Sequence, residues 1–196
     1  MKKLPWIISL ALAACCTWLV PAQAQSPKDY VRSILDRVMS IQSDSSLSNQ
    51  ARGQAIHRII AASFDFNMMA KDSLGSTYDT LSAGQRQAFD RTFSYLFQDS
   101  YTRMVLNFLK QENIKFGQET REGNNATVAT VIARTNENIP VTYRMHRAPQ
   151  GWLLYDVIVD GVSILQNYKT KFSRVIRTKS FQFLLDKMEQ QRRAIQ

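Results

Sequence analysis

Cysteine and histidine are almost absent from this sequence of 196 residues. The two cysteines, Cys15 and Cys16, lie within the first 24 residues, so the rest of the chain can form no disulfide and has no thiol for catalysis or metal binding. The two histidines, His57 and His146, could build a zinc site only with an unusual number of carboxylates. There is also no His-x-x-x-His pair, no phosphate-binding glycine loop and no Gly-x-Ser-x-Gly elbow. These absences favour a protein that binds over one that catalyses.

The N-terminus has the pattern of an export signal. Lys2 and Lys3 form a positive start, an apolar stretch runs to Val20, and Ala22-Gln23-Ala24 has the small-x-small form of a cleavage site. We therefore expect a signal peptide over residues 1–24, cleaved after Ala24, and a mature protein in the periplasm.

Two alternatives to this cleavage stay open. Leu12-Ala13-Ala14-Cys15 resembles a lipoprotein signal, which would leave a lipidated Cys15 at the mature N-terminus. The other alternative is an uncleaved membrane anchor. It is disfavoured because Pro5 and Thr17 interrupt an apolar run that is already shorter than the roughly 20 residues of a spanning helix.

Removal of the leader leaves a chain of ordinary domain size. The 196 residues less the leader's 24 leave 172, enough for one domain with a sizeable core over residues 25–196. Loss of Lys2 and Lys3 lowers the formal net charge from +9 to +7. A basic surface suits anionic lipid or an acidic partner, and export argues against nucleic acid.

Apolar periodicity divides the chain into helices, then strands, then helices. Ser26-Pro27 is an N-cap signal, and Ser82-Ala83-Gly84-Gln85 is a capping box before a long helix. Four strand-like runs separated by short turns predict an antiparallel meander, and helical spacing returns after Asp160-Gly161. We therefore expect an α+β fold with a four-stranded antiparallel sheet packed against a layer of helices. The expected strands are Ile114–Arg121, Ala126–Thr135, Ile139–His146 and Trp152–Val159, and the long helix is Ala83–Lys110.

An aromatic stripe on the long helix is expected to face the sheet. Ordinary core packing accounts for such a stripe, but the number of bulky side chains opposite only four strands favours an apolar cavity between the layers. Tyrosine hydroxyls would lie near its rim, and methionine would adapt to ligands of different length. The residues that we expect to line it are Phe93, Phe97, Met104, Phe108, Val141, Tyr143, Tyr155, Val157, Leu165 and Tyr168.

Asp156 and Asp160 are the only acids between Trp152 and Phe172. On one extended strand, side chains four residues apart share a face but stand roughly 13 Å apart. That distance is too long for the paired carboxylates of a glycosidase. We expect Asp160 to shape a turn. We expect Asp156 either to form an ion pair with a neighbouring basic residue such as Arg144 or to face solvent. A small cone-shaped α+β enzyme that uses Asp156 or Asp160 as a base stays open as an alternative.

The segment that holds these aspartates resembles a known family. Its Tyr155-Asp156-Val157, Asp160-Gly161-Val162-Ser163-Ile164, Asn167-Tyr168 and Phe172 resemble the signature of the MlaC family. A second block is similar to the same family, although Tyr78 stands near a position where the family often has tryptophan. The residues of this block are Phe64, Phe66, Met69, Ala70, Leu74, Gly75 and Gln85. The resemblance spans nearly the whole chain after the leader.

The resemblance implies a periplasmic carrier that shuttles phospholipid between outer- and inner-membrane complexes and so maintains the lipid asymmetry of the outer membrane. It implies two protein partners, an inner-membrane ABC transporter with an MCE-domain subunit and an outer-membrane lipoprotein–porin complex. It implies no reaction and no cofactor. A dry cavity suits this role, because an acyl chain of ~16 carbons gains on the order of 10 kcal/mol on leaving water. A carrier of another apolar ligand, a hopanoid or a solvent, stays open as an alternative.

Overall fold

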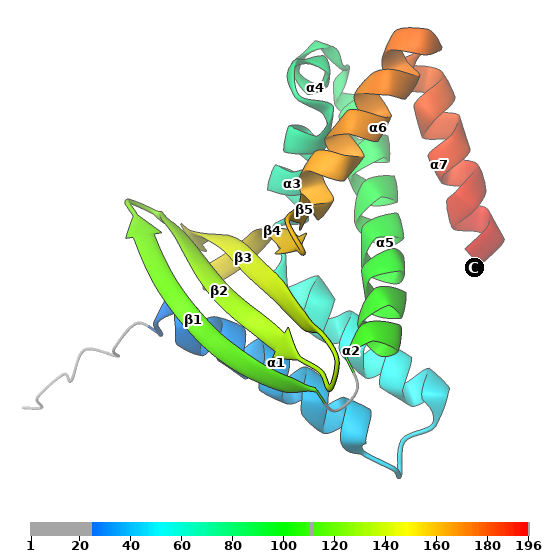
Figure 1. The fold of residues 1–196 in the computed structure, drawn as a ribbon. Coiled ribbons are helices and arrows are strands. Elements are labelled where there is room, and N and C mark those ends of the chain that lie inside the picture. The colour runs from blue at the N-terminus through cyan, green and yellow to red at the C-terminus, as the bar shows by residue number, and fades with distance from the viewer. Residues whose placement is uncertain (1–24, 110–111, 196) are drawn as a thin grey trace, which may run out of the picture.

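A computed structural model describes residues 25–109 and 112–195 (Figure 1). Helices precede and follow one antiparallel sheet, so the predicted α+β arrangement is confirmed. The predicted signal peptide and Cys15 lie outside the described residues. None of the described helices is long and apolar enough to cross a bilayer.

The elements are α1 Pro27–Ser43, α2 Asn49–Ser63, α3 Phe66–Leu74, α4 Ser76–Thr80, α5 Ala83–Phe108, β1 Asn113–Glu122, β2 Asn125–Ala133, β3 Asn138–Ala148, β4 Gly151–Val159, β5 Val162–Ser163, α6 Ile164–Thr178 and α7 Phe181–Ile195.

Both predicted helix starts are confirmed by their hydrogen bonds. The Ser26 hydroxyl accepts the backbone N–H of Asp29 at 3.0 Å at the start of α1. At the start of α5, the backbone N–H of Gln85 donates to the Ser82 hydroxyl at 3.3 Å, and the N–H of Ser82 donates to the Gln85 side chain at 2.9 Å. This reciprocal pair satisfies two of the N–H groups that a helix start otherwise leaves without a partner.

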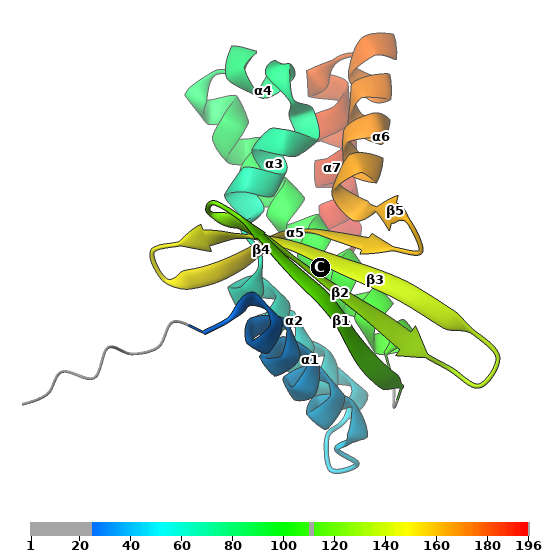
Figure 2. The same ribbon diagram turned by 60° about the vertical axis from the view of Figure 1, so that its left-hand side comes forward.

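Helix α5 joins the two helical parts of the molecule. Its 26 residues span roughly 39 Å at about 1.5 Å per residue. One end lies beside α2, and the other end lies beside α3 and α7 (Figures 1 and 2). The side chains of α5 can therefore line two different environments.

The sheet has the order β1-β2-β3-β4-β5, and every neighbouring pair is antiparallel. Alternate side chains of β2 and β3 are buried, which marks one face as the inner one. The cross-strand register places Val128, Tyr143 and Val157 in one row across that face. Helix α1 packs against β1 and β2. The predicted meander, with one covered face, is confirmed.

The sheet has five strands where the sequence predicts four. After β4 the chain turns at Asp160 and Gly161, whose φ angles are +49° and +77°, and pairs back as the two-residue strand β5. Two consecutive positive φ angles are typical of the tight hairpin turn that matches the twist of its strands. Val162, which the periodicity assigns to a helix, therefore lies in β5 and is 60% exposed, and α6 begins at Ile164 with Ser163 as its N-cap.

Changing Gly161 to alanine should lower the free energy of unfolding by about 1 kcal/mol. A residue with a Cβ is strained at this φ angle by about that amount. Apart from the adjoining residues, no atom lies within 4 Å of the place that the new methyl group would take, so the backbone strain alone sets the size of the effect. Urea unfolding at equilibrium measures it, with Gly84→Ala as the control, because Gly84 lies within helix α5 and also has open space around it. An equal or larger loss in the control would contradict the account of the turn.

Candidate functional site

The half of α5 near α6 packs in an aromatic core. Phe93 and Phe97 are 1% and 2% exposed, and their ring centroids lie 5.5 and 5.9 Å from that of Tyr168 on α6. Such ring pairs add about 0.5–1.5 kcal/mol each beyond the burial of their area. Three of the residues expected at a cavity wall, Phe93, Phe97 and Tyr168, are thus in mutual contact. Leu165 packs against the same core.

The other half of α5 faces the sheet across a small apolar cavity. Five of the expected lining residues meet there: Met104, Phe108, Val141, Tyr143 and Val157. Five further lining residues were not among those expected from the sequence, and these are Tyr101, Val105, Leu109, Ile132 and Val159. The cavity gives the centre of a water molecule about 30 Å³ of space. This space would hold a water or two, since one requires roughly 10–15 Å³.

Two tyrosines supply the polar groups of this cavity. Burial raises the pKa of Tyr143 to about 12, although a hydrogen bond with Thr130 opposes the shift. Burial also raises the pKa of Tyr101 far above its usual value, and the nearby Tyr143 and Asp156 add to the effect. Both phenols therefore stay protonated near neutral pH and can donate a hydrogen bond to a ligand oxygen.

Met104 is the most exposed of the residues that line the cavity, so we infer that its mouth lies beside Met104 and the neighbouring Phe108. Met104 is 36% exposed, whereas Phe108 is half-buried. The guanidinium of Arg134 lies 4.4 Å from the Phe108 ring centroid and donates to the Phe108 carbonyl at 2.6 Å. Arg134 also pairs with Glu112 at 3.2 Å. The mouth of the cavity thus combines a flexible methionine with a cation that could contact an anionic group.

Tyr155 lies away from the cavity because β4 contains a bulge. Arg144 pairs with Asp156 and Met145 pairs with Leu154, so Tyr155 has no partner in the register. An extra residue of this kind interrupts the rule that successive side chains of a strand point to opposite faces of the sheet. The Tyr155 ring lies 5.5 Å from the Arg144 guanidinium and lines a polar hollow with Thr127. Of the two β4 residues expected to line the apolar cavity, Val157 does so and Tyr155 does not.

Asp156 stabilises the start of α6. Its side chain is 2% exposed; one oxygen accepts the Ser163 hydroxyl at 2.7 Å, and the other accepts the backbone N–H of Leu165 at 3.0 Å. The predicted pairing with Arg144 is present at 3.9 Å, while the solvent-facing alternative is not. Asp160 is exposed in the turn, as predicted. Both aspartates therefore have structural roles in the junction between sheet and helix.

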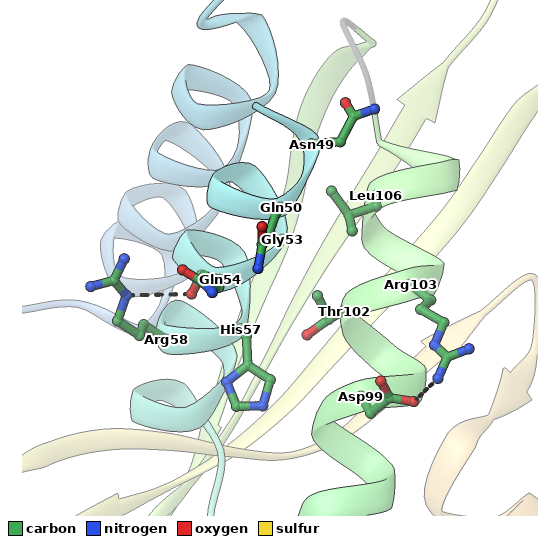
Figure 3. Close-up of a pocket in the computed structure, with 10 residues that line it drawn as sticks. All are labelled: Asn49, Gln50, Gly53, Gln54, His57, Arg58, Asp99, Thr102, Arg103 and Leu106. Carbon is green, nitrogen blue, oxygen red and sulfur yellow. Dashed lines mark hydrogen bonds and ion pairs between the residues drawn. The ribbon is translucent and has the colours of Figure 1, made fainter. Parts of the chain in front are cut away.

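A larger hollow lies between α2 and α5 (Figure 3). It gives the centre of a water molecule about 640 Å³, and Leu106 is its one large apolar side chain. Its other lining residues are mostly polar or charged types, although the carbon atoms of their side chains supply much of its wall. The lining residues are Asn49, Gln50, Gly53, Gln54, His57, Arg58, Asp99, Thr102, Arg103 and Leu106. We place the candidate apolar site in the smaller cavity because all of its lining residues are apolar or tyrosine side chains, from α5 and the inner face of the sheet.

Known proteins resemble this chain in sequence and in fold. The intermembrane phospholipid transport system binding protein MlaC of Haemophilus influenzae is 27% identical over 122 residues, which cover 60% of this chain and 57% of that protein. The phospholipid-binding protein of Ralstonia solanacearum, solved in complex with a phospholipid, superposes with a TM-score of 0.75. It is 19% identical, and the match covers 87% of this chain and 98% of that one, so it supports the fold.

A family model supports the same assignment. The model described as MlaC protein matches residues 29–190. This range contains both blocks that carry the resemblance, the whole sheet and all lining residues of the apolar cavity. Because the match extends over far more than half of the sequence, this chain belongs to the MlaC family.

Proposed function

We propose that this protein is a periplasmic phospholipid carrier, with residues 25–196 forming one lipid-binding domain. Acyl chains bind between α5 and the inner face of the sheet, and the head group stays near the mouth beside Met104 and Phe108. The observation that carries the proposal is an apolar cavity at this place in a chain of the MlaC family. The Haemophilus relative is named as a phospholipid transport binding protein, and the Ralstonia protein holds a phospholipid.

The energetics suit carriage of an acyl chain. Each methylene removed from water gains about 0.8 kcal/mol, so a ~16-carbon chain gains on the order of 10 kcal/mol. Transfer of a free phospholipid through water must overcome that cost, and a carrier with an apolar interior removes most of it. The protonated hydroxyls of Tyr101 and Tyr143 can then satisfy ester oxygens near the buried end of the head group.

Loading requires the cavity to enlarge. Sites that bury a ligand of this kind have volumes of roughly 300–1,000 Å³, far above the space between α5 and the sheet. The backbone of α5 packs mainly against α2, α3 and α7, so its approach to the sheet is through side chains. Rotation of Met104 and Phe108 and a movement of the sheet away from α5 would open the space without breaking the helical core.

The proposed partners are those that membership of the MlaC family implies. Phospholipid would pass between an inner-membrane ABC transporter with an MCE-domain subunit and an outer-membrane lipoprotein–porin complex, and this exchange would maintain outer-membrane lipid asymmetry. Neither step requires a reaction in the carrier. The chain accordingly acts by binding and release, with the structural roles of Asp156 and Asp160 leaving no base in the proposed mechanism.

Native mass spectrometry of the purified mature protein, followed by lipid extraction, tests this function. We expect a mass excess that extraction resolves into phospholipid. Recovery of a hopanoid or another apolar molecule in its place would favour the alternative carrier function. A ligand-free mass that stays unchanged after incubation with liposomes would contradict both carrier functions.

A further inference from the structure

The positive charge of the chain is concentrated near its C-terminus. Residues 25–160 hold 15 basic and 14 acidic side chains, whereas residues 161–196 hold eight basic and two acidic ones. The formal net charge is therefore +1 on the longer segment and +6 on the shorter one. No aspartate or glutamate occurs between Gly161 and Leu185. Such asymmetry within a chain indicates contact with an anionic polymer or surface.

The basic segment folds as the helical hairpin of α6 and α7, which packs against α3 and α5 and has its apex at one end of the molecule (Figures 1 and 2). Only Phe172 of α6 is buried. Five cations on α6 and at its C-cap are exposed: Lys169, Lys171, Arg174, Arg177 and Lys179. Within residues 25–109 and 112–195, none of these side chains makes an ion pair or a hydrogen bond, whereas Arg121, Arg134 and Arg144 each pair with an acid.

The spacing of these cations is unfavourable for an isolated helix. Lys171, Arg174 and Arg177 follow one another at three-residue intervals, which makes them neighbours on the helix surface. Like charges at this spacing repel, and only the last turn gains from the helix dipole. An anionic partner would turn this repulsion into attraction, so the arrangement favours a docking surface.

An exposed aromatic side chain lies near the apex of the same hairpin. Phe183, in the first turn of α7, is 41% exposed, and the Lys187 ammonium lies 5.8 Å from its ring centroid. Lys179 precedes it at the apex where α6 meets α7. We define the basic hairpin patch as Lys171, Arg174, Arg177, Lys179, Phe183 and Lys187. Basic side chains around an exposed apolar one are typical of helices that lie in the interface of a membrane.

We propose that the basic hairpin patch docks the protein on the surface of an anionic lipid membrane. This inference rests on the proposed function, because a phospholipid carrier must meet its cargo at a membrane. A fluid layer of anionic head groups requires no complementary shape, which suits exposed cations on long side chains. Phe183 inserts among the head groups while the surrounding cations contact phosphates.

Vesicle flotation tests the inference with two matched triple variants. Wild-type protein should float with vesicles of phosphatidylglycerol mixed with phosphatidylcholine, and should not float with phosphatidylcholine alone. The variant Lys171→Gln, Arg174→Gln, Arg177→Gln should bind on the order of a hundredfold more weakly, since each cation near the surface contributes about fivefold. The control Arg37→Gln, Arg58→Gln, Lys115→Gln removes the same charge from exposed positions on α1, α2 and β1, and should bind nearly as wild type.

The outcomes separate this inference from the carrier function. Equal binding to both kinds of vesicle, or equal weakening in the two triple variants, would overturn the membrane inference, and an acidic protein partner would then be the better explanation of the patch. Native mass spectrometry of the same samples reports the cargo. Phospholipid-loaded protein without vesicle binding would refute the docking surface alone, whereas vesicle binding by protein that never holds lipid would refute the carrier function.

Phe183→Trp gives a second readout that does not depend on charge. We expect its fluorescence emission to shift to the blue on mixed vesicles, because the indole leaves water for the head-group region. The other tryptophan of the described residues, Trp152, is buried. An emission spectrum that is unchanged while the protein is vesicle-bound would show that the apex does not insert.

Discussion

Replacing Val141 by tryptophan should abolish phospholipid loading in a chain that stays folded. Val141 is 3% exposed and lies in the cavity wall opposite α5, so an indole there occupies the space that an acyl chain would need. Exclusion of only three methylenes would weaken binding by about 2.4 kcal/mol, roughly 50-fold. Lipid occupancy by native mass spectrometry measures the effect. Val157→Trp should act in the same way, since Val157 lines the same wall.

Thr142→Trp is the matched control for this substitution. Thr142 is the next residue on β3 and points to the opposite, partly exposed face of the sheet. Overpacking at Val141 costs about 1–3 kcal/mol of stability, so circular dichroism and urea unfolding must first show that the variant is folded. Wild-type occupancy in folded Val141→Trp, or equal loss in Thr142→Trp, would place the ligand elsewhere.

Asp156→Ala should be the most destabilising of the substitutions proposed for this chain. It leaves the Ser163 hydroxyl and the Leu165 N–H without their buried acceptor and Arg144 without its acid. We expect a loss of about 3 kcal/mol in the free energy of unfolding, because each abandoned buried group costs about 1–3 kcal/mol. The midpoint of urea unfolding measures it.

Asp160→Asn is the comparison for this prediction. Asp160 is exposed, and asparagine tolerates its positive φ angle, so we expect a change within about 0.5 kcal/mol. Similar losses at the two positions would refute the assignment of Asp156 as the support of α6. Folded Asp156→Asn should also keep its lipid, and a loss of lipid without a loss of stability would point to a direct role at the ligand.

The order of the elements could be predicted from the sequence because each has a local cause. Ser26 and Ser82 satisfy helix N–H groups, and the alternation of Ile139, Val141 and Tyr143 is that of a strand with one buried face. The bulge at Tyr155 could not be predicted in this way. Its position depends on the register between β3 and β4, to which both strands contribute. The short strand β5 likewise could not be predicted, because it depends on how many residues after the turn pair with β4.

Only part of the cavity lining could be predicted, because the lining also depends on how distant elements pack together. Periodicity shows which side of α5 is apolar, but it does not show what covers that side. Phe93 meets Tyr168 of α6, whereas Met104 meets the sheet, although both belong to one stripe. The stripe is divided because α5 is long enough to contact the aromatic core near α6 with one half and the sheet with the other. The point along α5 where one set of neighbours gives way to the other is seen only in the tertiary structure. Tyr101 and Val105 belong to the same stripe and could have been added on that ground.

Photocrosslinking with a phospholipid that carries a diazirine in its acyl chain tests the central claim most directly. The loaded protein is irradiated, digested and mapped by mass spectrometry. We predict labels on α5 at Tyr101, Met104, Val105 and Phe108, and on the inner face of the sheet at Val141, Tyr143 and Val157. Labels concentrated on Gln50 and Gln54 of α2 would contradict the assignment and place the lipid in the larger hollow between α2 and α5.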